Sequence, residues 1–539
     1  MPSQEAHPQP LLSPEELLGF LRDPRAYPHH PERVDFLQTH ASYVFLVPPY
    51  VYKVKKPVNF GFLDYSTLEK RKRFCEQEVA LNRELCPEAY LGVIPIVREN
   101  GSLRLAGAGE PVEYAVRMAQ LPEEFFAKRL LREGRFGRPE LDRVAERLAA
   151  FYRSQKADEA VLDWGRVDKL RITSDENFAQ TEGDIGKTID RTTWETLRFF
   201  TDEFYRQRAA LLERRVREGW IKSGHGDLHL EHIHISPETL CIYDRIEFND
   251  RFRSVDMASD AAFLAMDLAF QGRLDLGRYF LERMAQQLDD TEMLELTDFY
   301  CCQRAYVRGK VESMTARDPL VPPAAQEACR QRARAYFALA LRYASVGSRP
   351  AVLAVMGRIG SGKTTLAAGL ARALGWKPLS SDPLRKELAG LAPAERPGEE
   401  VRSWLYSPEF SEKTYAEMLR RAQDALRTES GCVLDATFSR REERQRLREV
   451  CTQAGADLVF LEAQAEVSDR KDRLSTREKQ PGTVSDARLE NLDQLDQQYE
   501  APTELPKEAL LTIRCEGYPA ASASEALRAL AARKAAARP

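Results

Sequence analysis

The sequence predicts an α+β region followed by an α/β domain whose parallel sheet is wrapped by helices. Three observations support this fold class. Residues 41–121 are mostly strand-like around one long amphipathic helix, whereas residues 123–343 show mostly helical periodicity. Residues 352–374 then form an apolar strand, a glycine-rich loop and a helix, the order in which many nucleotide-binding α/β domains begin.

The composition is that of a globular protein with several cores. The chain has 539 residues, 43% of them hydrophobic and 30% charged, which is too long for one ordinary core. A net charge of −4 argues against a nucleic-acid coat or a membrane-surface protein. Nine cysteines without a CxxC pair are expected to be reduced thiols, and no signal peptide or membrane span is evident, so we expect a cytoplasmic protein.

The strand-rich region is predicted element by element. The segments YVFLVPP and YVYKVKKPV read as strands, and TLEKRKRFCEQEVALNREL reads as an amphipathic helix. Asn100-Gly101, between two apolar runs, predicts a type I′ hairpin. PVEYAVRMAQLP reads as a further strand that ends in a linker.

A histidine-rich stretch interrupts the helical region. Of the eight histidines, four lie within residues 225–234, beside several carboxylates. His225, His229 and His232 suggest a zinc site, although Gly226 and the alternating HIHI pattern are poor helix material. A loop without chemistry is a second interpretation, and a phosphotransferase loop is the third.

The third interpretation rests on a resemblance. His-Gly-Asp-Leu-His, from His225 to His229, resembles the catalytic loop of the aminoglycoside phosphotransferase and choline kinase group, which is similar in fold to protein kinases. The resemblance implies a bilobal, protein-kinase-like α+β domain. It also implies that Asp227 is the base that accepts the proton of a substrate hydroxyl, and that Asp244 holds Mg²⁺ against the phosphates of ATP.

The same resemblance implies a strand lysine and a helix glutamate that hold the α- and β-phosphates. VYKVKK offers Lys53 or Lys55, which share a face of the strand, and we prefer Lys53. Glu78 is the helix residue. Together with DRIEFND and DMASDAAFL, these segments resemble one bacterial branch that joins such a domain to a small nucleotide-loop kinase, over nearly the whole chain.

One position departs from the family pattern. Five residues after Asp227, where the family has an asparagine Mg²⁺ ligand, this chain has His232. Imidazole suits hard Mg²⁺ poorly, so Glu231 compensates, another metal is used, or the site is slow or inactive. Asp256 and Asp260, at the start of a predicted helix, are expected to cap it and to interact with its dipole.

The glycine-rich loop predicts a second nucleotide site. The pattern Gly-x-x-x-x-Gly-Lys-Thr follows an apolar strand, so backbone N–H groups can turn inward around phosphate oxygens. The lysine can reach the β- and γ-phosphates, and the threonine hydroxyl can hold Mg²⁺. The predicted nucleotide-binding residues are Gly357, Gly360, Ser361, Gly362, Lys363, Thr364 and Thr365.

Charged residues after the loop are candidates for phosphoryl transfer. Asp382 could accept the acceptor's proton and Arg385 could hold a phosphate, in a spacing that resembles polynucleotide 5′-hydroxyl kinases and zeta-toxin-like kinases. Asp435 ends an apolar strand and is predicted to serve Mg²⁺. Arg473 and Arg477, one turn apart in a lid-like segment, could close over the transferred phosphate.

These observations divide the chain and suggest its function. The predicted parts are an arm (1–30), a β-rich lobe (31–121), a helical lobe (122–344), a linker (345–350) and a P-loop kinase domain (351–539). We expect a bifunctional phosphotransferase that uses ATP and Mg²⁺ on a small-molecule hydroxyl acceptor or a nucleic-acid end, without a membrane. The alternative is an inactive, regulatory kinase-like domain that controls the P-loop kinase.

Overall fold

The computed structural model describes residues 12–392, 395, 397–428, 431–479, 488–517 and 519–537. The chain forms two compact units. The first comprises Met1–Leu170 with Leu211–Leu294, and the second Arg171–Ala210 with Glu295–Pro539. Helices α6 (Val167–Thr181) and α7 (Arg191–Arg217) each contribute to both units. The four boundaries between the five parts expected from the sequence stay a prediction.

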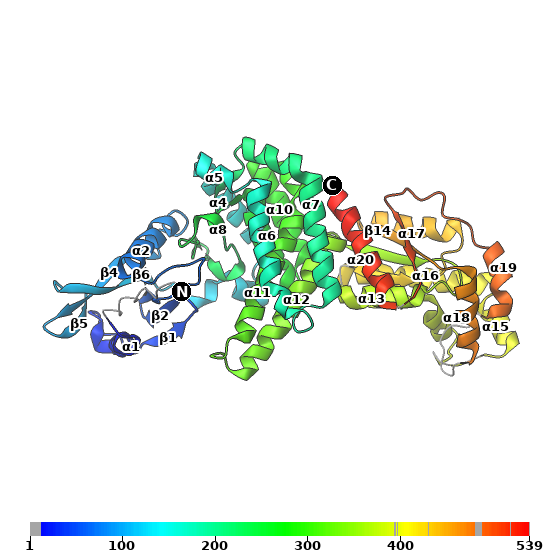
Figure 1. Cartoon of the computed structure of the whole chain (residues 1–539), viewed down its shortest axis with the longest axis horizontal. Helices are drawn as coiled ribbons and strands as arrows, with labels where there is room; N and C mark the ends of the chain where they lie inside the picture. The colour runs from blue at the N-terminus through cyan, green and yellow to red at the C-terminus, as the bar shows by residue number, and fades with distance from the viewer. Residues whose placement is uncertain are drawn as a thin grey trace, which may run out of the picture. The chain divides into compact units, whose positions relative to one another are not determined.

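A six-stranded antiparallel sheet opens the first unit (Figure 1). Its strand order is β1-β2-β3-β6-β4-β5, and α2 (Leu68–Asn82) packs against β4 and β6. Asn100 and Gly101 join β4 to β5 with φ angles of 49° and 81°, both positive as a type I′ turn requires. The strands are β1 (Asp35–Gln38), β2 (Ser42–Val47), β3 (Tyr50–Lys55), β4 (Tyr90–Glu99), β5 (Ser102–Leu105) and β6 (Glu110–Ala119).

The rest of the first unit is mostly helical. Its core is α9, in which every residue from Met257 to Leu268 is buried, because its sequence is apolar on nearly all sides. Two short antiparallel pairs, β7 with β10 and β8 with β9, carry the histidine-rich stretch between them. The elements are α1 (Pro14–Leu21), α3 (Ala127–Arg132), α4 (Arg138–Ser154), α5 (Glu159–Asp163), β7 (Ile221–Ser223), η4 (Leu230–His232), β8 (Ile233–Ile235), β9 (Leu240–Ile242), α8 (Asp250–Arg253), β10 (Ser254–Asp256), α9 (Met257–Phe270) and α10 (Leu274–Leu288).

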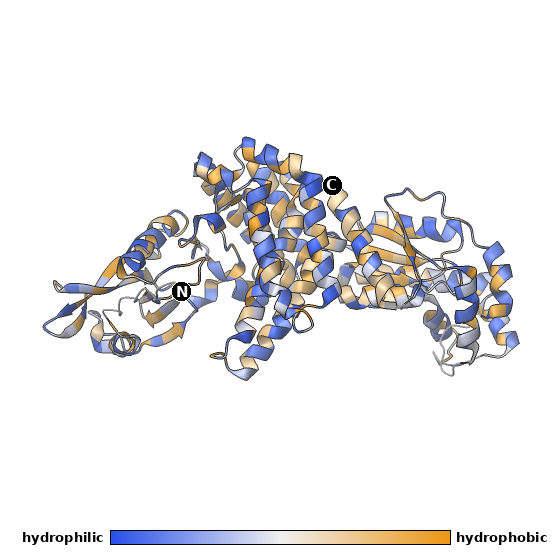
Figure 2. Cartoon of the chain, in the orientation of Figure 1, coloured by the Kyte–Doolittle hydropathy of each residue, from blue (hydrophilic) through white to orange (hydrophobic). Residues whose placement is uncertain are grey.

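The second unit contains the expected parallel sheet, in the order β12-β13-β11-β14-β15. Alternate residues of β11 face opposite sides of it. Leu353 and Val355 pack with α13 (Lys363–Leu374) and α20 (Pro519–Ala536). Val352 and Ala354 pack with α16 (Pro408–Thr428) and α17 (Arg441–Gln453). Figure 2 shows the strands in hydrophobic colours among helices with bluer outer faces. The strands are β11 (Ala351–Met356), β12 (Pro378–Ser380), β13 (Gly431–Asp435), β14 (Asp457–Gln464) and β15 (Leu510–Arg514).

The helices of the second unit include two that precede the predicted P-loop domain. Leu341 and Val346, at the end of α12, lie in the same hydrophobic cluster as Trp376 and Leu530. Lys534 forms an ion pair of 2.5 Å with Asp298 at the start of α11. The helices are α11 (Thr297–Arg317), α12 (Pro323–Ser345), α13 (Lys363–Leu374), α14 (Ser381–Leu388), α15 (Glu399–Leu405), α16 (Pro408–Thr428), α17 (Arg441–Gln453), α18 (Val467–Lys479), α19 (Leu492–Gln497) and α20 (Pro519–Ala536).

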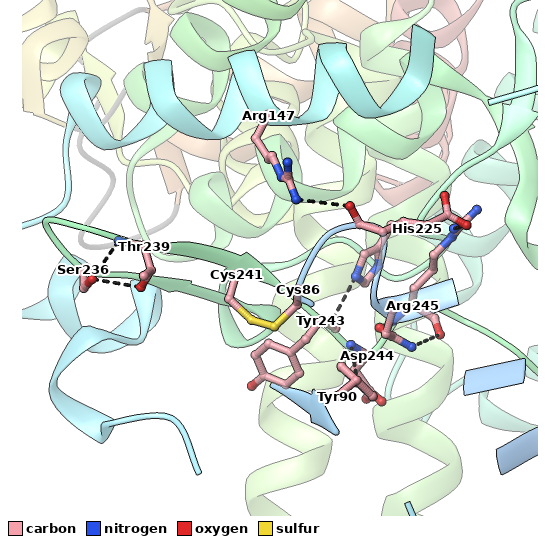
Figure 3. Close-up of a disulfide and its surroundings, with 12 residues drawn as sticks. Cys86, Tyr90, Arg147, His225, Ser236, Thr239, Cys241, Tyr243, Asp244 and Arg245 are labelled. Atoms are coloured by element: carbon pink, nitrogen blue, oxygen red, sulfur yellow. Dashed lines mark hydrogen bonds and ion pairs between the residues drawn. A yellow bond between two sulfur atoms is a disulfide. The ribbon is translucent and has the colours of Figure 1, made fainter. Parts of the chain in front are cut away.

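The cysteines differ from the expectation at one pair. Cys86 and Cys241 form a disulfide, next to Tyr243 and Asp244 (Figure 3), although they are 155 residues apart in the sequence. Such a pairing carries no local signal, which is why the sequence suggested thiols throughout. The other seven cysteines are buried and form no disulfide. Within the described residues, no helix combines the length and the apolar composition that crossing a bilayer requires.

Candidate functional site

The two strand lysines make different contacts. Lys53 Nζ lies 2.9 Å from Glu78 Oε1 and 2.7 Å from Asp244 Oδ1, and 17% of its side chain is exposed. Lys55 is 1% exposed, and its Nζ contacts Glu78 Oε2 at 2.6 Å and also contacts Glu247. Glu78 therefore bridges both lysines. Of the two lysines, Lys53 lines the cavity described below, and its role as the phosphate-binding lysine stays a prediction.

These buried groups hold one another in their charged forms. Burial opposes the charge on Lys53, but the Asp244 and Glu78 carboxylates outweigh it and raise the pKa of Lys53 well above its usual value. Burial likewise opposes ionisation of Asp244, yet the Lys53 ammonium holds the pKa of that carboxyl well below its usual range. The cluster therefore presents an ammonium group and carboxylates at neutral pH.

A carboxylate of α9 fixes the loop that carries Asp227 through hydrogen bonds to its backbone. Gly226 has φ of 85°, and a Cβ there would lie 2.8 Å from the Phe252 carbonyl oxygen, so only glycine fits. Asp260 accepts hydrogen bonds from the backbone N–H groups of His225 at 2.6 Å and Gly226 at 2.9 Å. These two bonds fix the backbone immediately before Asp227.

Asp256 and Asp260 therefore have different roles. Asp256 is the expected N-cap of α9, with its Oδ1 accepting from the Ala258 N–H at 2.8 Å. Asp260 lies in the first turn of α9, but its carboxylate is directed at the loop and also accepts from Tyr152 at 2.8 Å. The expectation of a helix-end role alone was incomplete for Asp260. The i, i+4 spacing gave no sign of a contact 35 residues earlier in the chain.

His232 connects the predicted base and the predicted metal ligand. Its Nδ1 lies 2.9 Å from the Asp227 carbonyl oxygen, which only accepts, so the ring donates there. Burial lowers the pKa of His232, so the ring is neutral and its Nε2 carries a lone pair. That Nε2 lies 3.5 Å from Asp244 Oδ2. Two electron-pair donors that face each other in this way suit a cation between them.

The donor set fits a divalent metal ion. Asp227, His229 and His232 each offer a ligand atom, and these atoms lie within 4.8 Å of one another. His225 does not belong to this group, because its Nε2 lies 2.9 Å from the Tyr243 carbonyl oxygen. The zinc site proposed from the sequence on His225, His229 and His232 therefore does not form. Imidazole nitrogen with carboxylate oxygen favours Mn²⁺ or Zn²⁺ over Mg²⁺.

A cavity of about 580 Å³ adjoins these residues in the first unit. Residues 118–121, at the end of β6 and just after it, form part of its wall, together with apolar side chains of the sheet. Lys53, Asp227 and Asp244 all open onto it. Its size is typical of small-molecule sites, and apolar walls beside charged groups suit a nucleotide base and its phosphates. We refer to it as the interlobe cavity.

The glycine-rich loop of the second unit has the shape that phosphate binding requires. Gly357, Gly360 and Gly362 have φ angles of 136°, 72° and 100°. A Cβ on Gly357 would lie 2.6 Å from the Ala463 carbonyl oxygen. The Ser361 hydroxyl is buried and has no hydrogen-bond partner among the described residues, and Lys363 Nζ donates to the Arg358 carbonyl oxygen at 2.9 Å. An anion in the loop would satisfy both groups.

The magnesium candidates of this loop lie together. Asp435, at the end of β13, accepts hydrogen bonds from the Thr364 and Ser380 hydroxyls, and burial raises the pKa of its carboxyl. Burial also lowers the pKa of Lys363, against the opposing effect of Asp435 and Asp382. Thr365 is exposed at the start of α13. A hydroxyl beside a carboxylate at a strand end is a donor set suited to Mg²⁺.

The candidate transfer residues Asp382 and Arg385 make different contacts. The carboxylate of Asp382 accepts from the Tyr406 hydroxyl at 3.4 Å. The buried guanidinium of Arg385 instead donates to the Leu405 carbonyl at 2.6 Å and stacks on Tyr406 at 4.5 Å. In this structure Arg385 therefore holds α14 against the turn after α15, and its contact with a phosphate stays a prediction.

The arginines of α18 lie beside the glycine-rich loop. Arg473 donates to the Gly360 carbonyl oxygen at 3.3 Å, and Arg477 affects the pKa of Lys363 through its charge. Arg470, one turn earlier, was not among the predicted residues; it donates to the Ile359 carbonyl at 2.8 Å and pairs with Asp496. Its i, i+3 spacing from Arg473 could have indicated it. The second half of the predicted lid, residues 480–487, lies outside the described residues.

Comparison with other sequences finds relatives over most of the chain. Residues 352–502 match a family model described as an AAA domain. The uncharacterized protein Rv2004c of Mycobacterium tuberculosis is 33% identical over 462 residues, which cover 85% of this chain and 88% of that protein. The uncharacterized protein Mb2027c of Mycobacterium bovis matches with the same values.

Solved structures resemble parts of the chain. A gluconokinase from Sinorhizobium meliloti is 21% identical and covers 34% of this chain and 92% of its own, with a TM-score of 0.26. The APS kinase CysC of Mycobacterium tuberculosis is 21% identical and covers 33% of this chain and 95% of its own, with a TM-score of 0.25. Choline kinase from Cryptosporidium parvum is 10% identical and covers 61% of this chain and 95% of its own, with a TM-score of 0.38.

Proposed function

The chain belongs to the same family as these mycobacterial proteins, and for this family member we propose a bifunctional, ATP-dependent phosphotransferase. Each half transfers the γ-phosphoryl group of ATP to a hydroxyl group, with a divalent cation. The acceptor is a small molecule or a nucleic-acid end, and the protein works in the cytoplasm. The aminoglycoside phosphotransferase resemblance describes the architecture of the first half and leaves its acceptor open.

One observation carries the proposal for the first half. Lys53, Asp227 and Asp244 come from a strand, a loop and the end of a second strand, yet all three open onto the interlobe cavity. Phosphoryl transfer needs mainly positioning and charge neutralisation, and this arrangement supplies both. The Lys53 ammonium neutralises phosphate oxygens, and the Asp244 carboxylate holds the cation beside them.

Asp227 is then the group that acts on the acceptor. Its carboxylate accepts the hydroxyl proton as the acceptor oxygen forms a bond to the γ-phosphorus and the bond to the ADP oxygen breaks. Asp260 keeps Asp227 in place through the two backbone bonds before it. The cation supplies charge neutralisation on the phosphates, held by Asp244 with His232.

In the second half the glycine-rich loop supports the proposal. The left-handed glycines and the unpartnered Ser361 hydroxyl suit a triphosphate, and Lys363 reaches it from the first turn of α13. Asp382 accepts the proton of the second acceptor, and Arg473 stabilises the transferred group from α18. Asp435 holds the cation together with Thr364.

The test is an ATP-consumption screen over acceptor classes with each half silenced in the full chain. Lys363→Ala should remove the activity of the second half only, and Asp227→Asn that of the first half only. Each variant should unfold at the same urea concentration as the parent chain. Undiminished turnover in Asp227→Asn would discard its role as base, and unchanged turnover in Lys363→Ala would discard the P-loop assignment.

A second candidate is a regulatory first half that binds nucleotide without catalysis. His232 favours it, because the imidazole faces Asp244 where a family member has an amide oxygen. In the Lys363→Ala chain this candidate predicts ATP binding without ATP consumption for any acceptor and any divalent cation. Consumption with one cation would reject it.

A further inference from the structure

A second cavity lies beside the predicted catalytic loop. Its volume is about 890 Å³, and it shares two wall residues, Glu123 and Phe126, with the interlobe cavity. Glu231 also lines it and lies four residues after Asp227 in the same loop. The lining residues are Glu123, Phe126, Lys128, Arg129, Leu131, Arg132, Glu231, Gln271 and Arg273. We refer to it as the basic cavity.

The walls of the basic cavity carry an excess of positive charge. Its lining includes four cationic side chains and two carboxylates, so the excess is two charges. The cations come from two separate segments: Lys128, Arg129 and Arg132 lie on α3, and Arg273 lies between α9 and α10. Two segments that bring cations to one cavity indicate a site for an anion.

The charges are only partly neutralised by neighbours. Lys128 pairs with Glu231 at 2.5 Å, and Arg129 pairs with Glu133 at 2.8 Å. Arg273 pairs with Asp275 at 2.8 Å. For Arg132 the structure gives no ion pair with the described residues.

The helix itself does not explain this arrangement. Arg132 lies one turn after Lys128 and Arg129 on a helix of six residues, and like charges at these spacings repel. A basic last turn favours the helix dipole, which accounts for Arg129 and Arg132. It does not account for Lys128 in the first turn, nor for Arg273 on another segment. An anionic ligand would give Arg132 a partner beside three cations that already pair with carboxylates.

We propose that the basic cavity binds the acceptor of the first half, and that this acceptor is an alcohol that also carries a phosphate or carboxylate group. The inference rests on the proposed function of that half. Arg132, with Arg129, holds the anionic group in bidentate hydrogen bonds, while the hydroxyl lies toward Asp227. In the transfer step the hydroxyl loses its proton to Asp227, its oxygen binds the γ-phosphorus, and ADP leaves. A polycationic aminoglycoside would be repelled here.

Matched acceptors test this charge preference. We would measure ATP consumption by the full-length Lys363→Ala chain with glucose and glucose 6-phosphate, glycerol and glycerol 3-phosphate, glycerate, and kanamycin. We expect turnover with an anionic alcohol and at least tenfold less with its neutral partner and with kanamycin. The phosphorylated alcohols and glycerate separate a phosphate from a carboxylate requirement.

Substitutions then locate the anion. Arg132→Glu should raise KM for the anionic acceptor at least tenfold and change kcat less than twofold, and Arg132→Lys should recover part of the loss. Arg166→Glu is the matched control, because it makes the same charge change on an exposed loop of the first unit. Equal turnover of neutral or cationic acceptors, unaffected by Arg132→Glu, would overturn the inference and leave the proposed function intact.

Binding measured without turnover separates the anion site of the basic cavity from the proposed phosphotransferase function. If no acceptor is consumed, equilibrium dialysis measures anion binding directly. The probes are radiolabelled glucose 6-phosphate, glycerol 3-phosphate and glycerate, with the ADP-saturated chain. Binding that Arg132→Glu removes and Arg166→Glu keeps would support the anion site and count against the proposed function. Absence of binding for all three anions would overturn the inference.

Discussion

At the scale of single residues, Lys53 and Lys55 show how two neighbours on one strand face acquire different tasks. Both contact Glu78, but only Lys53 also contacts Asp244 and lines the interlobe cavity. We expect Lys53→Met to lower kcat/KM of the first half by about 100-fold or more, because an oriented charge on the phosphates is lost. ATP consumption in the Lys363→Ala chain measures this. Full activity of Lys53→Met would indicate that Lys55, and not Lys53, binds the phosphates.

Lys55→Met should act on stability instead. The substitution leaves Glu78 with only Lys53 and leaves Glu247, 5% exposed, without its ammonium partner. Removing one partner of a buried ion pair costs about 3–5 kcal/mol. Urea unfolding should therefore show a loss of that size for Lys55→Met and a smaller one for Lys53→Met, whose side chain is less buried. Equal losses in the free energy of unfolding for the two variants would contradict the distinction between Lys53 and Lys55.

The cation preference depends on His232. Since its Nε2 faces Asp244 and imidazole suits softer divalent ions than Mg²⁺, we expect Mn²⁺ to support the first half at least about tenfold better than Mg²⁺. His232→Asn should reverse the order by supplying an amide oxygen. The measurement is ATP consumption by the Lys363→Ala chain with each cation. If the Lys363→Ala chain and its His232→Asn variant prefer the same cation, His232 does not select the metal.

The sequence predicts site residues that lie in one short segment better than contacts between segments far apart in the chain. Lys53 and Glu78 were named because the family resemblance implies a strand lysine and a helix glutamate in short, neighbouring segments, and strand alternation left Lys53 and Lys55 as the two candidates. The partnership of Lys55 with Glu247 spans 192 residues, and that of Asp260 with His225 spans 35. Such contacts depend on tertiary packing, and neither periodicity nor a motif encodes them. The disulfide between Cys86 and Cys241 was missed for the same reason.

At the scale of elements, α9 supports the catalytic loop through one carboxylate. Asp260→Asn keeps the shape of the side chain but places an NH₂ group toward backbone N–H donors, so one of the bonds to His225 or Gly226 is lost. We expect kcat of the first half to fall about 10- to 100-fold, with little change in KM for ATP, because Asp227 is displaced and the nucleotide contacts remain. Asp168→Asn, in the exposed first turn of α6, is the control. A change in KM alone would contradict a positioning role.

The elements themselves were largely predictable. Strand-like runs identified β2 to β6 of the first sheet, whereas β1 was not expected, and a continuous apolar run identified β11. The parallel order around β11 agrees with the expected strand–helix alternation. The division into units was less accessible, because α6 and α7 run through both of them. A helix with continuous periodicity gives no sign of the point at which its contacts change. Residues 345–350 lie within the second unit, where Val346 packs with Trp376 and Leu530, and the predicted domain boundaries stay a prediction.

At the scale of the whole molecule, the P-loop domain depends on the helix before it. Leu341 and Val346 are buried in the cluster of Trp376 and Leu530, so a fragment of residues 351–539 would lose both side chains. Burial of a leucine and a valine contributes about 3–6 kcal/mol, a large part of the stability of a typical domain. The fragment would also lose the ion pair between Asp298 and Lys534.

We therefore expect residues 351–539 alone to unfold at clearly lower urea concentration than residues 295–539, as followed by tryptophan fluorescence. The Arg342 guanidinium lies 5.4 Å from the Trp376 ring, so this ring also reports the loss directly. Leu341→Ala in the longer fragment should give an intermediate midpoint, since one of the two side chains is truncated. Identical midpoints for the two fragments would show that the domain is autonomous. The expected result explains why each half must be silenced by substitution within the full chain rather than by cutting at the linker.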